Sequence, residues 1–354
     1  MYVGTYTGPE SKGIYAFRYD PASGKATSIG VAAESVNPSF LAVDPRQRFL
    51  YAVNEVGDYK GEKTGGVSAF SIDRKTGKLT FLNEVTSRGA GPCHVSLDKT
   101  GKYVLVANYD SGSVAVFPVL ADGKLGEASG FVQHTGHGPD KERQEGPHAH
   151  EIQVSADNRF AIVADLGLDE LLVYRFDSAK GTLTPNDPPF ALVEPGAGSR
   201  HFVFHPEGKH AYTLNEMGGN ITVLSYDSAK GSLRSEQLIS SLPKDFKGKN
   251  DSAEIASSSD GKFLYASNRG PDNIAVFAID PGRKTLKLVE HVSTKGKTPR
   301  NFVIDPSGRY LLAANQESNN IVVFRIDAKT GRLSETGQVI AVPSPVCIVF
   351  VPAE

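Results

Sequence analysis

The hydrophobic and polar positions follow one pattern that recurs along the chain. Each copy holds an apolar run, a polar turn such as DPSGR, a second apolar run and a terminal Asn or Asp. Six copies are complete, and they read LAVDPRQRFLYAVNE, VSLDKTGKYVLVANY, IQVSADNRFAIVADL, FVFHPEGKHAYTLNE, IASSSDGKFLYASNR and FVIDPSGRYLLAANQ. Two apolar runs joined by a short polar turn predict a β-hairpin.

The spacing of the copies indicates the architecture. Their terminal polar residues are Asn54, Asn108, Asp165, Asn215, Asn268 and Asn315. The successive spacings are 54, 57, 50, 53 and 47 residues. A period of about 50 residues is typical of a propeller blade. Each copy continues with an alternating segment, such as NIAVFAI or NIVVFRI, and then a weaker run, so each unit predicts four short strands.

A seventh unit is divided between the two ends of the chain. The segment VCIVFVP at 346–352 matches a first strand, while MYVGTYT, GIYAFRYD and ATSIGVAAE supply the other three. Pairing these ends would close the ring and cover the exposed sheet edges. We therefore predict an all-β, seven-bladed β-propeller with four-stranded antiparallel blades, in which the N- and C-terminal strands share the closing blade. Residues 1–354 are expected to form this single domain, because closed all-β folds often run long.

The predicted fold brings chemically distinct side chains together. In an antiparallel hairpin the first strand begins where the second strand ends, so both points converge on one mouth of a central channel. The repeated Asn or Asp is interpreted as a turn device that satisfies local backbone groups. The residues beside it, and those that open the first strands, differ from blade to blade. Individually different polar residues at a channel mouth predict a binding pocket.

Four histidines fall within 17 residues: His134, His137, His148 and His150. Imidazole is a common zinc ligand, but the first two lie in the glycine-rich loop HTGHGPDKERQEG, so we expect neither a metal nor a cofactor. Side chains two positions apart on a strand share a face. We expect His150 to reach the channel as an acid, a base or a substrate ligand, and the alternative is a structural histidine.

Cationic side chains stand at the neighbouring entrances. A guanidinium presents a planar fork that suits carboxylate or phosphate oxygens, so Arg200, Arg269 and Arg300 are predicted to contact an anionic substrate. A salt bridge from Arg200 to Glu216 or Glu254 is the alternative interpretation, and it is compatible with substrate contact. Glu216 is expected to act as a general base or to orient His150. The further candidates for substrate contact, chosen by position, are His94, His148, His201 and Gln316.

Composition narrows the partners. The chain has 38 Lys and Arg against 40 Asp and Glu and no block of like charge, which argues against nucleic acid or a membrane surface as the main partner. The sequence shows no long apolar span and no export signal, so we expect a cytoplasmic protein. Cys93 and Cys347 fall in first strands of non-adjacent blades, and we expect both to be reduced and unpaired. The oligomeric state stays open.

Four segments carry a family resemblance: GPHAHEIQVSADNRFAIVADLGLDELLVYRFD, GAGSRHFVFHPEGKHAYTLNE, SNRGPDNIAVF and RNFVIDPSGRYLLAANQ. Together they resemble the lactonase family of seven-bladed propellers, which includes propeller-type 6-phosphogluconolactonases and the fungal 3-carboxy-cis,cis-muconate lactonizing enzyme. The resemblance covers essentially the whole chain. It implies a metal-independent site of a histidine, arginines and a glutamate, which fall here on His150, Arg200, Glu216 and Arg269, with His148 as the alternative histidine. Where relatives commonly have GPRH, this chain has GSRH.

The resemblance implies hydrolysis of a sugar lactone, with 6-phosphogluconolactone as the expected substrate. The residues agree with this chemistry, because opening an ester needs an activated water, a stabilised oxyanion and an anchor for the acidic substrate. His150, helped by Glu216, would activate the water. Arg200 would stabilise the oxyanion, and Arg269 would hold the phosphate or carboxylate of the substrate. Two alternatives stay open. One is a lactonizing enzyme or cycloisomerase that acts on a di- or tricarboxylate, and the other is a non-catalytic interaction platform.

Overall fold

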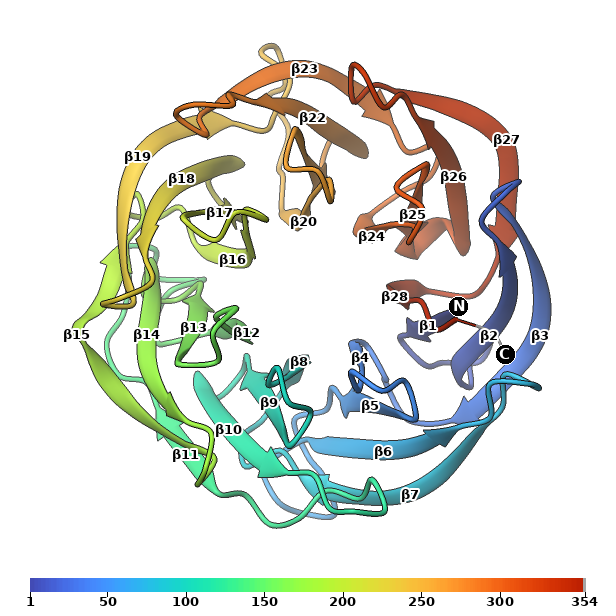
Figure 1. Ribbon diagram of the computed structural model, residues 1–354, viewed down its shortest axis with the longest axis vertical. Helices are drawn as coiled ribbons and strands as arrows, with labels where there is room; N and C mark the ends of the chain where they lie inside the picture. Colours follow the sequence, from blue (N-terminus) through green and yellow to red (C-terminus); the bar gives the residue numbers. More distant parts are fainter. Residues whose placement is uncertain (353–354) are drawn as a thin grey trace.

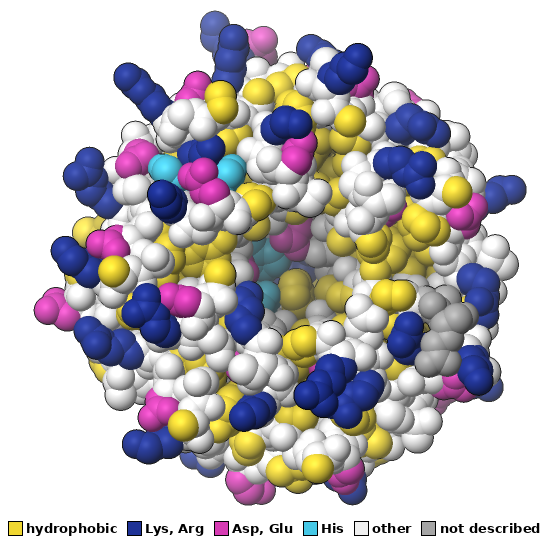
Figure 2. All heavy atoms as spheres, in the orientation of Figure 1, with side chains coloured by type: hydrophobic (Ala, Val, Ile, Leu, Met, Phe, Trp, Pro, Cys, Tyr) yellow, Lys and Arg dark blue, Asp and Glu magenta, His cyan; other side chains and the backbone are white. Residues whose placement is uncertain are grey.

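The computed structural model describes residues 1–352 and confirms the seven-bladed β-propeller. Seven four-stranded antiparallel sheets stand around a central channel, with the first strand of each blade innermost and the fourth outermost (Figure 1). Figure 2 shows the channel as a hollow at the centre of the face in view, with histidine and acidic side chains inside it. In residues 1–352 no helix is long or apolar enough to cross a membrane.

The strands are grouped here by their rank within a blade. The first strands are β4 (Leu41–Val43), β8 (Pro92–Leu97), β12 (Ala149–Val154), β16 (Ser199–Phe204), β20 (Ser252–Ser257), β24 (Pro299–Ile304) and β28 (Pro345–Val349). The second strands are β1 (Tyr2–Thr5), β5 (Phe49–Asn54), β9 (Tyr103–Asn108), β13 (Phe160–Asp165), β17 (His210–Asn215), β21 (Phe263–Asn268) and β25 (Tyr310–Asn315). The third strands are β2 (Gly13–Asp20), β6 (Gly66–Ile72), β10 (Ser113–Pro118), β14 (Glu170–Asp177), β18 (Asn220–Asp227), β22 (Asn273–Ile279) and β26 (Asn320–Ile326). The fourth strands are β3 (Lys25–Glu34), β7 (Leu79–Thr86), β11 (Gly130–Gln133), β15 (Thr182–Leu192), β19 (Ser232–Ser240), β23 (Leu286–Ser293) and β27 (Leu333–Ala341). A single turn of 3-10 helix, η1 (Gln316–Ser318), follows β25.

The closing blade combines the two ends of the chain, as predicted. Its strand order is β28-β1-β2-β3, and β28 pairs with β1 in antiparallel register, with Val3 opposite Ile348. The two chain ends therefore lie side by side in the ring (Figure 1). Because this pairing covers the free edges of both segments, the ring closes without an exposed inner edge.

The core lies between the blades. Seven buried apolar clusters form, one for each pair of neighbouring blades. In one of them Leu105 and Val116 of one blade pack against Ile152 and Val163 of the next. Since each sheet has a neighbour on both faces, the second strands are mostly apolar, and β9 is buried at every position. This packing holds the channel mouth as a rigid frame.

The repeated Asn has a wider role than the local turn function that the sequence suggested. The amide of Asn268 donates a hydrogen bond to the carbonyl oxygen of Ser241 at 2.8 Å, and the amide of Asn108 donates to that of Ser87 at 3.1 Å. In both cases the acceptor follows the fourth strand of the preceding blade. The side chain thus connects neighbouring blades, and single-blade reasoning could not reveal this because the two groups are far apart in sequence.

We expect the Asn268→Ala substitution to lower the free energy of unfolding by about 1–3 kcal/mol, because it leaves buried polar partners unsatisfied. Asn268 is fully buried, and its amide oxygen also accepts hydrogen bonds from Ser241 and Ser252. Urea unfolding measures the effect. Lys287→Ala, an exposed position in the same blade, serves as the control and should change stability little. Equal stability of the two variants would contradict the inter-blade role.

Candidate active site

A β-bulge opens most first strands. The register shifts at the entrances of β8, β12, β16, β20 and β24. A bulge sets two residues against one partner and redirects a side chain, so consecutive residues need not alternate strictly. We define the channel-mouth layer as seven residues that lie at these bulges or directly follow a second strand: Cys93, His150, Arg200, Arg300, Tyr109, Glu216 and Arg269.

Glu216 is the centre of an arginine cluster. Its carboxylate is 5% exposed, and its Oε2 accepts a hydrogen bond from Nη2 of Arg269 at 2.8 Å. Nε of Arg200 lies 2.8 Å from the same oxygen, in an ion pair without hydrogen-bond geometry. Nη2 of Arg143 donates to Oε1 at 2.6 Å. The predicted pairing of Arg200 with Glu216 is therefore present, within a larger network.

The electrostatics of Glu216 limit its chemistry. Burial alone would raise the pKa of the Glu216 carboxyl, but Arg269, Arg200 and Arg143 outweigh burial and lower the pKa to about 2. A carboxylate with so low a pKa stays ionised and is a weak proton acceptor at neutral pH. In residues 1–352, Glu216 forms no hydrogen bond or ion pair with His150. The geometry favours a role in holding the arginines, and direct catalysis by Glu216 stays a prediction.

Arg300 stands apart from this carboxylate. Its guanidinium lies over the ring of Tyr6, 5.4 Å from the ring centroid, and makes no ion pair or side-chain hydrogen bond in the described part of the chain. The Tyr6 hydroxyl donates to both carboxylate oxygens of Glu55 at 2.9 Å, and Ser39 donates to the same carboxylate. Burial alone would lower the pKa of Arg300, but Tyr6 and Glu55 raise it overall. Arg300 therefore keeps its charge and has no carboxylate partner among the described residues.

His150 lies at the bulge of β12, among aromatic rings. It is 4% exposed, and its ring meets those of Tyr109 and His201 edge to face, with centroid distances of 5.5 and 5.2 Å. Its Nδ1 is buried without a hydrogen-bond partner in residues 1–352. Burial first, and then the charges of Arg200, His201, Arg300 and Arg269, hold the pKa of His150 well below 6.5. The imidazole is therefore neutral at neutral pH.

His148 has different surroundings. Its ring stacks on Tyr109 with a centroid distance of 4.5 Å, and its Nδ1 lies 3.0 Å from the Tyr109 carbonyl oxygen. Its Nε2 lies 3.4 Å from Oε1 of Glu145. The two histidines of the PHAH segment thus flank one tyrosine. His148 is held by hydrogen-bonding and ionic partners, whereas the side chain of His150 has none among the described residues.

The two earlier histidines belong to the loop before β12. His134 is buried, with its Nδ1 2.6 Å from Oδ2 of Asp165, and His137 is exposed. Among residues 1–352 no three metal-ligating side chains come close enough to hold an ion. The buried amide of Gln144 further anchors the loop, which positions Arg143 against Glu216. Sequence reasoning missed Arg143, and its place four residues before the start of the PHAH segment was the available signal.

The other predicted residues lie around this centre. We define the buried layer as the residues one step along the first strands, namely His94, Glu151, His201, Glu254 and Asn301. His94 and His201 are about as buried as His150. Gln316 lies in η1, and its side chain forms no hydrogen bond with the mouth residues of the described chain. Cys93 and Cys347 are both buried, and neither forms a disulfide among the described residues. Burial raises the pKa of Cys347 to about 12 and that of Cys93 well above its usual value, so neither is a ready nucleophile.

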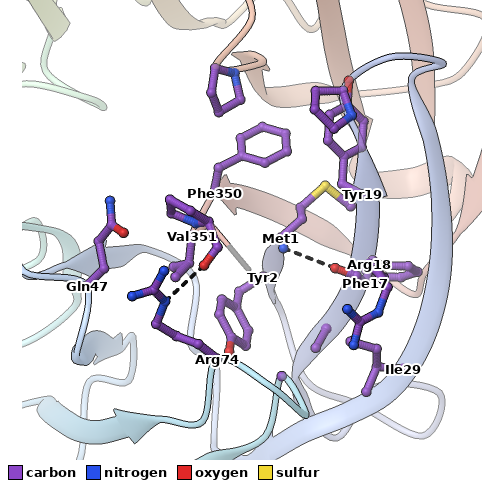
Figure 3. Close-up of a pocket in the computed structure, with 15 residues that line it drawn as sticks. Met1, Tyr2, Phe17, Arg18, Tyr19, Ile29, Gln47, Arg74, Phe350 and Val351 are labelled. Atoms are coloured by element: carbon purple, nitrogen blue, oxygen red, sulfur yellow. Dashed lines mark hydrogen bonds between the residues drawn. The ribbon is translucent and has the colours of Figure 1, made fainter. Parts of the chain in front are cut away.

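A second hollow lies in the closing blade. It has a volume of about 500 Å³ and is lined mainly by apolar and aromatic side chains, among them Tyr2, Phe17 and Phe350 (Figure 3). The Met1 amine donates a hydrogen bond to the Phe17 carbonyl oxygen at 3.0 Å beside it. The residues that line this cavity include none of the channel-mouth layer, so the cavity is separate from the site around His150.

Known proteins resemble the chain over its full length. Residues 1–350 match the family model described as lactonase, 7-bladed beta-propeller. A 6-phosphogluconolactonase of Bacillus subtilis is 41% identical, and the alignment covers 99% of this chain and 97% of the relative. The periplasmic gluconolactonase of Pseudomonas aeruginosa is 36% identical with a TM-score of 0.93, covering 100% of this chain and 99% of that one. A putative 6-phosphogluconolactonase of Bacteroides fragilis is 38% identical with the same TM-score of 0.93, covering 99% and 97%. The chain therefore belongs to the lactonase family of seven-bladed β-propellers.

Proposed function

We propose that this protein hydrolyses a phosphorylated sugar lactone, 6-phosphogluconolactone, to the open-chain acid. The observation that carries the proposal is the neutral imidazole of His150 next to the cationic groups of Arg200, Arg269 and Arg300 at one channel mouth. Relatives named 6-phosphogluconolactonase, at 41% and 38% identity over nearly the whole chain, support the same substrate.

His150 is the proposed general base. It accepts a proton from a water molecule while the water oxygen bonds to the lactone carbonyl carbon. When the ring C–O bond then breaks, the same proton passes to the leaving oxygen, so one residue serves first as base and then as acid. Base assistance of this kind typically accelerates a reaction by about 10² to 10⁴. An acceleration of this size is sufficient for a lactone that also hydrolyses spontaneously.

The arginines are proposed to divide the negative charges. Arg200 is 2% exposed and fixed by Glu216 and by the Ala253 carbonyl oxygen, which suits a preorganised donor for the developing oxyanion. Arg300 has no carboxylate partner in residues 1–352, so its fork is available to the phosphate. Arg269, whose pKa burial lowers to about 10, remains cationic at neutral pH and is proposed as a second anchor for the phosphate.

The test compares substrates and one variant. We expect the purified protein to remove 6-phosphogluconolactone faster than buffer alone, as followed by NMR with the spontaneous rate subtracted. Arg300→Met should raise KM for the phosphorylated lactone by about 10- to 100-fold, since a hydrogen bond to a charged group contributes roughly 1.5–3 kcal/mol. Its effect on unphosphorylated gluconolactone should be small.

Two results would count against the proposal. A wild-type rate equal to that of buffer would remove the lactonase activity. Lactonisation of a carboxymuconate under the same conditions, with no hydrolysis of the sugar lactone, would favour the cycloisomerase alternative.

The proposed partner is thus a small anionic lactone, and the proposed location is the cytoplasm. The location is supported by the substrate, because a phosphorylated sugar carries charges that are costly to move into a lipid bilayer. The Pseudomonas aeruginosa relative is a periplasmic enzyme. Cell fractionation of the native host decides between the two compartments, and recovery of the protein in the periplasmic fraction would contradict the proposal.

A further inference from the structure

We infer that Glu254 and His201 form a relay beneath His150, which fixes the proton of His150 on Nδ1 and leaves Nε2 free as the base. In this arrangement both are positioning residues that act through His150, and His201 is not primarily a substrate contact. The inference deepens the proposed lactonase function and rests on it for its kinetic consequence. Its structural content is testable without any substrate.

The first link joins the carboxylate to the deeper imidazole. Nδ1 of His201 lies 3.0 Å from Oε1 of Glu254, and both side chains are largely buried. A carboxylate accepts hydrogen bonds, so this contact places a proton on Nδ1 of His201. Nε2 of the neutral ring then carries a lone pair. That Nε2 is buried and has no partner in residues 1–352.

The second link joins the two imidazoles. The rings of His201 and His150 meet at a centroid distance of 5.2 Å and an interplanar angle of 72°. His150 contributes its own buried and unpartnered nitrogen, Nδ1. Two orphaned polar atoms in contacting rings would each cost about 1–3 kcal/mol unless they satisfy one another. The inferred link is a direct hydrogen bond between these two nitrogens, which the contacting rings form by a small rotation.

The direction of this second link follows from the first. Because Nε2 of His201 is an acceptor, Nδ1 of His150 has to be the donor. The hydrogen bond at one ring nitrogen sets the tautomer of the whole imidazole. Nε2 of His150 is then unprotonated, which is the form that a general base requires.

Within residues 1–352, Glu254 is the only carboxylate in contact with His201. The Asn301 amide donates to Oε2 of Glu254, and the backbone amide of Ile255 donates to Oε1. The rings of His94 and Phe40 each lie 5.8 Å from that of His201. These contacts hold the carboxylate in place, and none of them competes for Nε2 of His201.

The relay also offsets an electrostatic disadvantage. Burial lowers the pKa of His201, Glu254 raises it, and the neighbouring Arg200 and Arg300 lower it again. The same two arginines depress the pKa of His150. A base surrounded by guanidinium groups is weak, and a carboxylate behind it restores part of its proton affinity. Glu254 is the group placed to do so through His201.

The first test reads the tautomer directly. In ¹⁵N-histidine-labelled protein, long-range ¹H–¹⁵N spectra distinguish protonated from bare ring nitrogens, and loss of signals in His150→Asn assigns the residue. We expect a proton on Nδ1 and none on Nε2 of His150 at neutral pH. In Glu254→Gln and His201→Phe this preference should weaken. A wild-type His150 protonated on Nε2 would overturn the inference, whatever the enzyme hydrolyses.

The second test reads the chemistry. Removing the Glu254 charge in Glu254→Gln should move the acid limb of kcat/KM to lower pH, because the imidazolium of His150 loses a stabilising negative charge. The plateau of kcat should fall by about 10- to 100-fold, as is typical when a group that orients an active imidazole is lost. KM should change little, since Glu254 does not touch the substrate.

Glu151→Gln is the matched control. Glu151 is the other carboxyl of the same layer, and its oxygens accept hydrogen bonds from the Phe202 backbone amide and the Gln153 side chain, so it has no part in the link to His201. We expect it to leave the acid limb in place. Equal pH profiles of Glu254→Gln and wild type in an active, folded enzyme would overturn the relay alone. An inactive wild type that shows the expected tautomer would instead remove the lactonase proposal and keep the relay.

Discussion

Replacing His150 by alanine is expected to lower kcat for lactone hydrolysis by about 10² to 10⁴, the usual contribution of a general base. The fold should survive, because the His150 side chain makes no hydrogen bond in the described residues and lies at a channel mouth outside the apolar clusters between blades. Lactone disappearance measured by NMR, with spontaneous opening subtracted, gives the rate. The exposed His137, in the preceding loop, provides the control substitution His137→Ala, which should retain full activity.

The pH profile tests the same residue from another side. Burial and the mouth arginines hold the pKa of His150 well below 6.5, so its base form is already present at neutral pH. We therefore expect kcat/KM to stay level through the neutral range and to fall only at pH values well below 6.5. An acid limb at or above 6.5 that disappears in His150→Ala would show that the imidazole is not depressed in this way.

The Glu216→Ala substitution is expected to lower the free energy of unfolding by about 3–5 kcal/mol, the typical cost of removing one partner from a buried ion pair. The reason is that Arg200 and Arg269 lose the carboxylate oxygen that lies 2.8 Å from each of them. Urea unfolding gives the stability and lactone hydrolysis the activity, and activity should fall as well because the arginines lose their alignment. Glu317→Ala, an exposed site on η1, is the control and should leave stability and activity nearly unchanged.

Acid sensitivity provides a second measurement for Glu216. Its pKa in the folded protein, about 2, lies below the usual value of 4.5, so ionised Glu216 stabilises the folded state above that usual value. This contribution is lost progressively as the pH falls from 4.5 toward 2. The isosteric Glu216→Gln variant removes the titrating group and should flatten this part of the stability profile. Unchanged acid sensitivity in Glu216→Gln would mean that other carboxylates account for it.

The architecture could be predicted from the sequence because it is repetitive. A hairpin pattern with a period of about 50 residues reports local strand and turn preferences, which each blade satisfies on its own. The same repetition located the channel mouth, since a residue such as Arg200 or Arg300 stands out where other copies hold small or apolar residues. The divided closing blade could be predicted as well. The N-terminal segment supplies three strands and the C-terminal segment one, and pairing them covers the sheet edges that would otherwise be exposed.

The details of the site depended on contacts between blades. No pattern within one repeat shows that Arg143 reaches Glu216 from a loop 73 residues earlier, or that Asn268 holds the end of the preceding blade. The bulges that redirect His150 and Arg200 are likewise visible only in the strand register.

The sequence by itself thus determined the fold, the closure of the ring and the set of residues at the channel mouth, because local hydrophobic periodicity encodes strands and their order. Only the tertiary structure decided which arginines share the carboxylate of Glu216, which one has no carboxylate partner in residues 1–352, and which imidazole contacts that of His150. The physical reason is that charge pairing, burial and tautomer choice depend on groups that are distant in the chain and that meet only when seven blades close.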